Sequence, residues 1–420
     1  MTGAARPHDS VRRLTVVVAL LSTLGAYTID AFFPSMRAMA AEFGVSYWTV
    51  QQTLTVYMIP YGFFSLLHGS LSDALGRRRV VLVGLALYAV ASAGCALAPT
   101  FGALLVFRFL QGVVGGVGMI IGRAVVRDRY SGAQAQRVMS AITIMFSLGP
   151  ALAPVIGGWV HVWFGWRAVF GSMAIYGLVL TLLVLRQLPE SLPVSKRTPL
   201  QFGALVRNMV GVARHAEFLL LTAASSLSFV ALQTYIGAAP AIIMDHWHGS
   251  ETGFAMLTIP IITGHSIGGF LSGRLAGRLP PARQANYGYT MLLVATGAML
   301  ALQSLVREPP IIIQQLLLAG TALGLQLMFP IVTLRVLDLF AHARGAATSA
   351  HSFCVLMCGA VVMGLLSPWL SVSMERLALT AFAANLAGWL VWRLARRHQR
   401  ALGAATAEAG DGAGAGIAGS

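Results

Sequence analysis

Long apolar runs, each followed by a short polar break, repeat along almost the whole chain. Each run is about 20 residues long, which is the length that a helix needs to cross the hydrocarbon core of a bilayer. The runs cover residues 13–34, 48–70, 79–98, 101–122, 137–160, 167–187, 217–240, 251–273, 285–305, 310–334, 345–370 and 376–395. This pattern predicts an all-α integral membrane protein with about 12 transmembrane helices.

One long polar break, at residues 188–216, separates the first six runs from the last six. We therefore expect an N-terminal six-helix bundle at 1–187, a polar linker at 188–216 and a C-terminal six-helix bundle at 217–398. The remaining residues, 399–420, are rich in Gly and Ala and have no apolar face. Such a composition predicts a disordered tail.

A short motif occurs once in each half, between the second and third runs of that half. "GSLSDALGRRR" begins at Gly69 and "GFLSGRLAGRL" begins at Gly269. The identical positions are Gly69 and Gly269, Leu71 and Leu271, Ser72 and Ser272, Leu75 and Leu275, and Arg78 and Arg278. Two similar six-span halves are typical of secondary transporters, whose substrate site lies between the halves near the middle of the membrane.

Charge gives the chain an orientation in the membrane. Only 10% of the residues are charged, against about 25% in soluble domains, which excludes a soluble monomer. The net charge of +15 would indicate nucleic acid as a partner of a soluble protein, but 24 of the 29 lysines and arginines fall on the side of the N-terminus. Such an excess marks the cytoplasmic side. We expect a multi-pass inner-membrane protein with both termini and the linker in the cytoplasm, and no nucleic-acid partner.

The sequence offers no motif for a cofactor, a metal or ATP. The three cysteines lie in apolar runs and lack the spacing of a metal site. Lys196, the single lysine, follows Ser195 rather than Gly, so there is no P-loop. H-E-x-x-H does not occur, and G-x-S-x-G occurs only as residues 264–268, inside an apolar run, so neither motif favours an enzyme. An ion gradient is the simplest remaining energy source.

Several motifs resemble those of the major facilitator superfamily. "GSLSDALGRRR" resembles the loop signature G-x-L-x-D-x-x-G-R-[RK]-x-[RK], "RFLQGVVGG" from Arg108 resembles the signature R-x-x-x-G of span 4, and "SLGPALAPVIGG" resembles the span 5 signature of proton-coupled exporters. "TIDAFFPSMRAMAAEFGVS", "RAVVRD" and "GWRAVF" are similar to the bicyclomycin-resistance subfamily of drug exporters. The resemblance covers most of the N-terminal half and implies a major facilitator fold.

The resemblance also implies a gate on the cytoplasmic side. Asp73 would dock on the start of the eleventh span, and Arg77 would pair with Asp128 at the end of the fourth. The proposed gate residues are Gly69, Asp73, Gly76, Arg77, Arg78 and Asp128. The alternative is that the arginines only anchor a cytoplasmic loop. Because Gly273 replaces Asp73 in the second copy, we expect the gate to be one-sided.

Span 5 is rich in residues that kink a helix or let another helix approach. These residues are Gly149, Pro150, Pro154, Gly157 and Gly158, and span 8 offers a counterpart in Gly264, Gly268 and Ser272. Small residues four apart allow close helix packing, and prolines remove backbone donors. We predict a tight seam between the two halves. The alternative is a general packing face.

Asp30 and Arg108 are the charges expected deep in the membrane. A charge there is costly and normally faces a cavity or a partner. Both lie at similar depth in the first half, so we predict that they meet and that Asp30 takes up and releases the coupled proton. The alternatives are a static ion pair or an Asp30 in interfacial water. His68, His265 and His351 are further proton-carrying candidates.

These observations predict a secondary transporter that exports small lipophilic compounds, such as drugs or antibiotics, in exchange for protons. Candidate cavity-lining residues are Tyr27, Tyr57, Tyr61, Gln111 and Tyr235. We expect a monomer in contact with membrane lipid, driven by the proton gradient without a cofactor. One alternative is a proton-coupled importer of a nutrient such as a nucleoside. Another is a polytopic enzyme or receptor scaffold.

Overall fold

The computed structural model describes residues 7–200, 202–250, 252–340 and 344–415, and every regular element in these ranges is helical. Ten of the helical segments described are long and apolar enough to cross a membrane. Helices α3 (Tyr47–Leu75) and α7 (Gly132–Phe164) have 29 and 33 residues, so they are long enough to cross as well. The predicted all-α membrane fold is confirmed, and its crossings follow the predicted apolar runs.

The remaining elements of the first half are α1 (Pro7–Asp30), η1 (Phe33–Ser35), α2 (Met36–Phe43), α4 (Arg77–Ala96), α5 (Phe101–Gly115), α6 (Val117–Arg129) and α8 (Trp166–Gln187). The linker holds η2 (Val194–Lys196) and α9 (Phe202–Ala213). The second half contains α10 (Ala216–Gly237), α11 (Ala239–Ala241), η3 (Ile242–His246), α12 (Ala255–Leu275), α13 (Pro281–Leu305), α14 (Ile311–Leu339), α15 (Arg344–Val361), η4 (Val362–Leu366), α16 (Ser367–Leu370) and α17 (Met374–Ala415).

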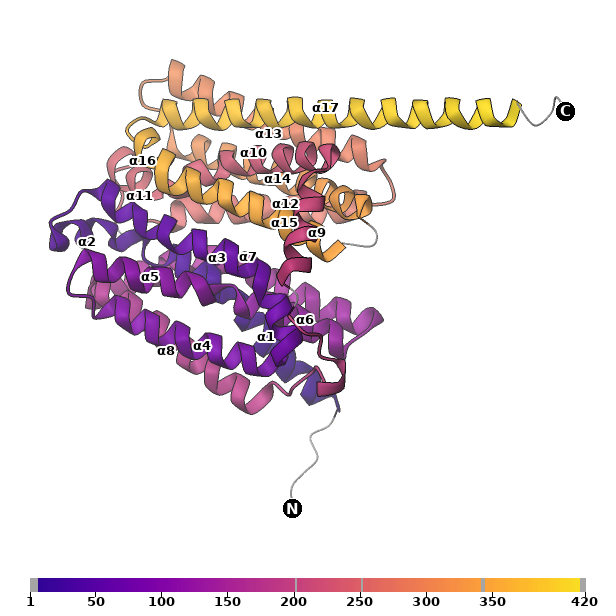
Figure 1. Cartoon of the computed structure of the whole chain (residues 1–420). Coiled ribbons are helices and arrows are strands. Elements are labelled where there is room, and N and C mark those ends of the chain that lie inside the picture. The colour runs from indigo at the N-terminus through magenta and orange to yellow at the C-terminus, as the bar shows by residue number, and fades with distance from the viewer. Residues whose placement is uncertain (1–6, 201, 251, 341–343, 416–420) are drawn as a thin grey trace.

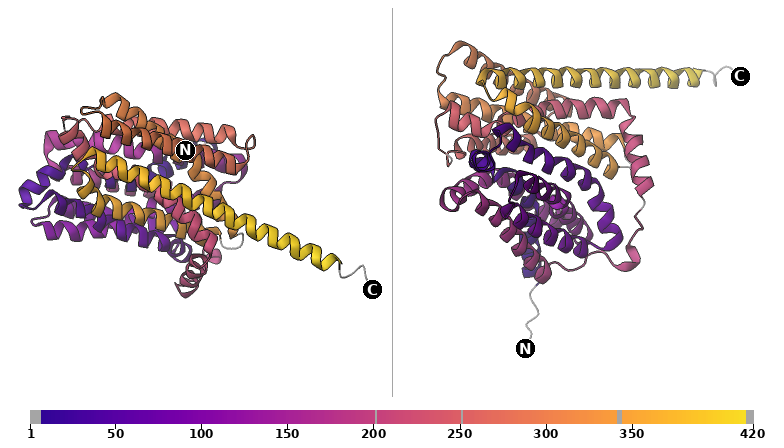
Figure 2. Two further views of the ribbon diagram at one scale, coloured as in Figure 1. Left: turned by 90° about the horizontal axis from the view of Figure 1, so that it is seen from above. Right: turned by 60° about the vertical axis from the view of Figure 1, so that its left-hand side comes forward.

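The two halves form two bundles that lie against each other. In Figure 1 the bundle of α1 to α8 is indigo to magenta, the bundle of α10 to α17 is rose to yellow, and α9 runs between them at one end. We call that end the basic side, because it carries Arg77 at the start of α4 and Arg129 at the end of α6. The opposite side carries α2, α11 and α16, where the bundles meet (Figures 1 and 2).

Within each half, glycines let certain helices approach so closely that their backbones are in contact. A Cβ at Gly157 of α7 would overlap the carbonyl oxygen of Ala31, directly after α1, and a Cβ at Gly112 of α5 would overlap the carbonyl oxygen of Tyr57 in α3. In the second half, a Cβ at Gly264 of α12 would overlap the carbonyl oxygen of Ala319 in α14. The second and fourth spans of each half are therefore packed in the same way.

Two glycines of span 5, Gly149 and Gly157, do not lie at the predicted seam between the halves. Gly149 and Gly157 face α1, where a Cβ would meet Ala26 and Ala31, and Gly158 is buried. Only the prolines of this stretch, Pro150 and Pro154, line the boundary with α12. Residues three or four apart share one helix face, so the glycine face and the proline face of α7 serve different partners.

The end of the chain also differs from the prediction. Helix α17 continues through residues 399–415 where a disordered tail was expected, and residues 416–420 lie outside the described residues. Alanine has the highest intrinsic helix propensity, and this stretch contains several. The extension projects well beyond the bundle (Figure 1).

Close packing of α7 on α1 makes Gly157 sensitive to the addition of one methyl group. We expect Gly157→Ala to destabilise the protein by about 1–3 kcal/mol, because overpacking displaces the backbone. The matched control is Gly171→Ala in α8, where a Cβ would have nothing within 4 Å. Thermal unfolding in detergent should show a lower midpoint for Gly157→Ala and an unchanged or slightly higher midpoint for Gly171→Ala. Equal midpoints would contradict the close packing.

Candidate functional site

Arg108 of α5 is fully buried inside the first half and ties three spans together. Its guanidinium donates to the carbonyl oxygens of Thr28 and Thr53, each at 3.3 Å, and its Cζ lies 4.5 Å and 4.6 Å from the ring centroids of Phe32 and Tyr57. Carbonyl oxygens and aromatic faces stabilise a buried cation without a carboxylate. Arg108 therefore holds the end of α1 and the middle of α3 around α5.

Gln111, one turn after Arg108, extends this buried polar cluster. Its side-chain oxygen accepts a hydrogen bond of 3.0 Å from Arg108, and its Nε2 donates to the hydroxyl of Ser92 at 2.8 Å. The hydroxyl of Tyr57 is buried and has no partner among the described residues. Arg108, Gln111 and Tyr57 thus form one cluster, as their helices α3 and α5 pack directly.

Of the other predicted cavity-lining tyrosines, Tyr61 lies beside Tyr57, whereas Tyr27 and Tyr235 have other surroundings. The Tyr27 hydroxyl is 2.8 Å from that of Ser172 in α8, and the Tyr61 ring lies against Gly25 and 5.7 Å from the Tyr57 ring. Tyr235 is buried in α10 of the second half. That these five residues line one cavity stays a prediction. Their residue type could be read from sequence, but the direction of each side chain could not.

Asp30 lies at the boundary between the halves and not beside Arg108, so the predicted meeting of the two charges is wrong for this structure. Asp30 is 6% exposed and lines a pocket whose other walls are apolar apart from Thr258, whose hydroxyl donates to the carbonyl oxygen of Phe254. Those walls come from η1, α7, α10, α11 and α12 and include Phe33, Pro154, Ile236, Ala239, Leu257 and Ile261. Among the described residues its carboxyl group has no hydrogen bond and no ion pair.

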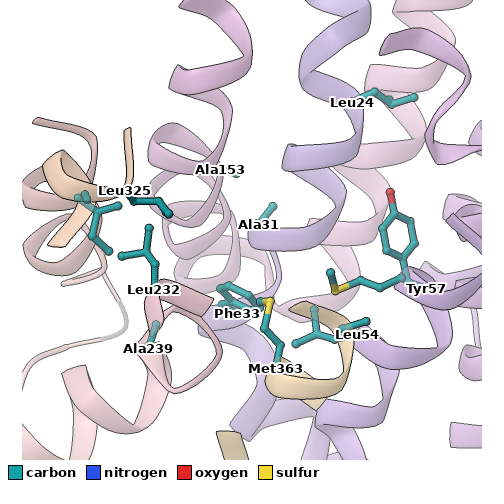
Figure 3. Close-up of a cluster of buried hydrophobic side chains, with 14 of the residues drawn as sticks. Leu24, Ala31, Phe33, Leu54, Tyr57, Ala153, Leu232, Ala239, Leu325 and Met363 are labelled. Carbon is teal, nitrogen blue, oxygen red and sulfur yellow. The ribbon is translucent and has the colours of Figure 1, made fainter. Parts of the chain in front are cut away.

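The rotation of a helix explains why these charges separate. Residues two apart point in directions about 200° apart around the axis. The Thr28 hydroxyl contacts that of Tyr88 in α4 at 2.5 Å, so this face of α1 looks into the first half. Asp30 consequently faces the second half. Figure 3 shows Phe33, Ala153, Leu232 and Ala239 at this boundary, together with Met363 of η4.

The three candidate histidines lie in helices α3, α12 and α15. His68 is buried in α3, and its Nδ1 has no partner among the described residues. His351 of α15 lies with Nδ1 3.2 Å from the hydroxyl of Thr222, and His265 of α12 has Nδ1 3.1 Å from the carbonyl oxygen of Ile261 in its own helix. The contact of His351 joins α15 to α10, whereas that of His265 stays within its own helix.

On the basic side, Arg77 binds two acids of its own half. Its guanidinium is 3.1 Å from the carboxylate of Asp128 and 2.5 Å from that of Asp73, and it donates to the hydroxyl of Ser72 at 2.6 Å. The expected docking of Asp73 on the start of α15 is not present among the described residues, and residues 341–343 lie outside them. Asp73 lies in the last turn of α3 and Arg77 begins α4 directly after Gly76, so this ion pair is local in sequence.

Glu190, which the sequence reasoning missed, occupies the helix N-terminus in this region. Its carboxylate accepts hydrogen bonds from the backbone N–H groups of Arg77, at 2.9 Å, and Arg78, at 3.2 Å, at the start of α4. The macrodipole favours an anion there. Gly76 makes room, because a Cβ would lie 2.7 Å from a Glu190 oxygen. The signal was available: α4 begins with three arginines and has no acid of its own.

On the opposite side, a set of polar contacts joins the two halves, and this set was also missed. Arg37 of α2 forms an ion pair with Asp245 of η3. Gln51 and Gln52 of α3 donate to the carbonyl oxygens of Gly237, at 3.1 Å, and Gly364, at 2.8 Å. Both η3 and η4 are π-helical turns, which frequently occur at functional sites. These contacts close the opposite side in this structure.

The Arg37–Asp245 pair should therefore help to set how often the opposite side opens. We expect Arg37→Asp to open it through repulsion between two acids, and the double variant Arg37→Asp with Asp245→Arg to close it again. Spin labels at Ala41→Cys and Val372→Cys, in a background without the three native cysteines, would report the distance. An opening in the single variant that the double variant does not reverse would mean that the pair has no part in closure.

Comparison with known proteins agrees with this architecture. Residues 15–363 match the family described as Major Facilitator Superfamily. The chain is 26% identical over 356 residues to an uncharacterized MFS-type transporter of Bacillus subtilis, covering 84% of this chain and 88% of that protein. It is 31% identical over 227 residues to a bicyclomycin resistance protein homolog of Haemophilus influenzae (54% and 57%), and 28% identical over 351 residues to a chloramphenicol resistance protein of Pseudomonas aeruginosa (82% and 80%).

Solved transporter structures share the fold. A bacterial homolog of the human lysosomal transporter Spinster, in an inward-facing conformation, superposes with a TM-score of 0.70 at 15% identity, covering 94% of this chain and 98% of that one. A D-xylose–proton symporter superposes with a TM-score of 0.69 at 14% identity, covering 90% and 97%. With the helical architecture, the two bundles and the match over most of its length, this chain belongs to the Major Facilitator Superfamily of multi-pass membrane transporters.

Proposed function

We propose that this transporter exports small lipophilic compounds, such as drugs, in exchange for protons. The observation that carries the proposal is the Asp30 carboxyl group, held without an ion partner in a largely apolar pocket where α1, α7 and α12 meet. The names of the bicyclomycin and chloramphenicol resistance relatives support export of such compounds. In this proposal the chain lies in the inner membrane as a monomer, with both termini in the cytoplasm.

Alternating access would change the surroundings of Asp30. The pocket has walls from both halves, so any rocking of one half against the other alters it. A carboxyl group enclosed by apolar side chains favours its protonated form, and the same group reached by water favours its charged form. Asp30 would therefore bind a proton in one state and release it in the other.

The two sides of the protein fit this cycle. The contacts of Arg37, Gln51 and Gln52 close the opposite side, so in this proposal the structure represents a state open to the cytoplasm. The ion pairs of Arg77 lie within the first half and do not oppose its movement away from the second half. Arg108 would keep α1, α3 and α5 together as one moving body.

Transport in inside-out vesicles tests the proposal. With an acidic interior reported by a pH-sensitive dye, a panel of lipophilic drugs should trigger alkalinisation of the interior in vesicles with the wild-type protein. Asp30→Asn should abolish this response, because the amide cannot carry the proton. The matched control is Glu375→Gln, which neutralises an exposed acid at the start of α17 and should leave the response unchanged.

Other outcomes assign the activity differently. A response that survives Asp30→Asn would move proton coupling to another group, with the histidines as the next candidates. If no drug triggered a response from the wild-type protein, drug export would be overturned. The same assay with nucleosides and sugars would then test the alternative of a proton-coupled nutrient importer.

A further inference from the structure

The two copies of the duplicated motif differ in how their arginines are neutralised. In the first half, Arg77 is paired with Asp73 and Asp128. In the second half, Gly273 stands where the first has Asp73, and the segment 269–283 contains no acid. Its arginines, Arg274, Arg278 and Arg283, are exposed and form no ion pair among the described residues. This turn has basic charge that the described part of the protein does not balance.

The position of Arg274 places this charge at the edge of the apolar surface. Its Cζ lies 4.5 Å from the centroid of the Phe270 ring, and Phe270 is 63% exposed on α12. In a membrane-spanning helix, an exposed ring of this kind faces lipid. An arginine at the end of such a helix extends its charged group toward the headgroups while its stem covers apolar surface.

A second group of arginines lies next to this turn. The indole N–H of Trp392 in α17 donates to the side-chain oxygen of Asn286 in α13 at 2.9 Å, so these antiparallel helices are in register there. Arg283 precedes Asn286 by about one turn, and Arg393 and Arg397 follow Trp392 toward the same side, both exposed. Arg393 also stacks on an aromatic ring, that of Trp389, at 5.1 Å.

We propose that the turn between α12 and α13, together with the adjoining part of α17, binds the headgroup of an anionic phospholipid. The unpaired arginines of the turn attract the anionic headgroup. The aromatic rings that stack on Arg274 and Arg393 hold these arginines at the level of the headgroups. There is room for the headgroup, because a Cβ at Gly273 or Gly277 would have nothing within 4 Å. A juxtamembrane basic cluster contributes to binding of anionic lipid through each of its charges. This inference does not depend on the direction of transport or on the substrate.

The test uses the full chain in phosphatidylcholine vesicles that contain a trace of spin-labelled phosphatidylglycerol or spin-labelled phosphatidylcholine. The spectrum gives the fraction of labelled lipid held at the protein surface. We expect wild-type protein to prefer phosphatidylglycerol. Arg274→Gln and Arg278→Gln should each reduce this preference about fivefold if the full effect of one charge is lost. Arg307→Gln, an exposed arginine on the opposite side, should not.

The first half supplies a matched pair of variants. Gly273→Asp restores the acid found at Asp73 and should reduce the preference, whereas Gly273→Asn has nearly the same size without charge and should retain it. Both side chains fit the open space at Gly273, so folding is preserved. Equal binding of the two labelled lipids by wild type, or an undiminished preference in Gly273→Asp and the arginine variants, would overturn the proposal. Displacement by added inorganic phosphate would also overturn it, by showing a site for a free anion.

Discussion

Backbone-to-backbone contact between helices inside each half is the constraint on which the rest of this structure depends. Gly157 against Ala31, Gly112 against Tyr57 and Gly264 against Ala319 leave no space for a Cβ. Lipid tails are as apolar as leucine, so helices in a membrane are held by close packing and hydrogen bonds rather than by exclusion from water. Each half therefore behaves as a body that resists internal deformation.

The polar contacts across the boundary between the halves are weaker. An exposed ion pair such as Arg37–Asp245 contributes about 0–1 kcal/mol, and a hydrogen bond such as that of Gln52 contributes a similar amount. Such contacts can form and break during a transport cycle. The backbone contacts named above lie within each half, whereas these polar contacts lie between the halves, an arrangement that would suit the proposed rocking.

The charges follow the same division. Arg108 is enclosed by carbonyl oxygens and aromatic rings of its own half, and Arg77 is paired with acids of its own half. Asp30 differs because it lies at the boundary, where movement changes its surroundings. Its position is what makes Asp30, rather than Arg108, the stronger candidate for coupling.

The sequence by itself determined the membrane fold, the positions of the crossings and the superfamily, because apolar length and local motifs are read along one helix at a time. It also indicated the Arg77–Asp128 pair through a motif. Only the tertiary structure decided that Asp30 turns away from Arg108, that the glycines of α7 serve α1, and that Glu190 and the Arg37–Asp245 pair have partners far along the chain. Those facts depend on the rotation of each helix about its axis and on which helices are neighbours. Neither the rotation of a helix nor the identity of its neighbours follows from the period of its apolar residues when most of its sides are buried or face lipid.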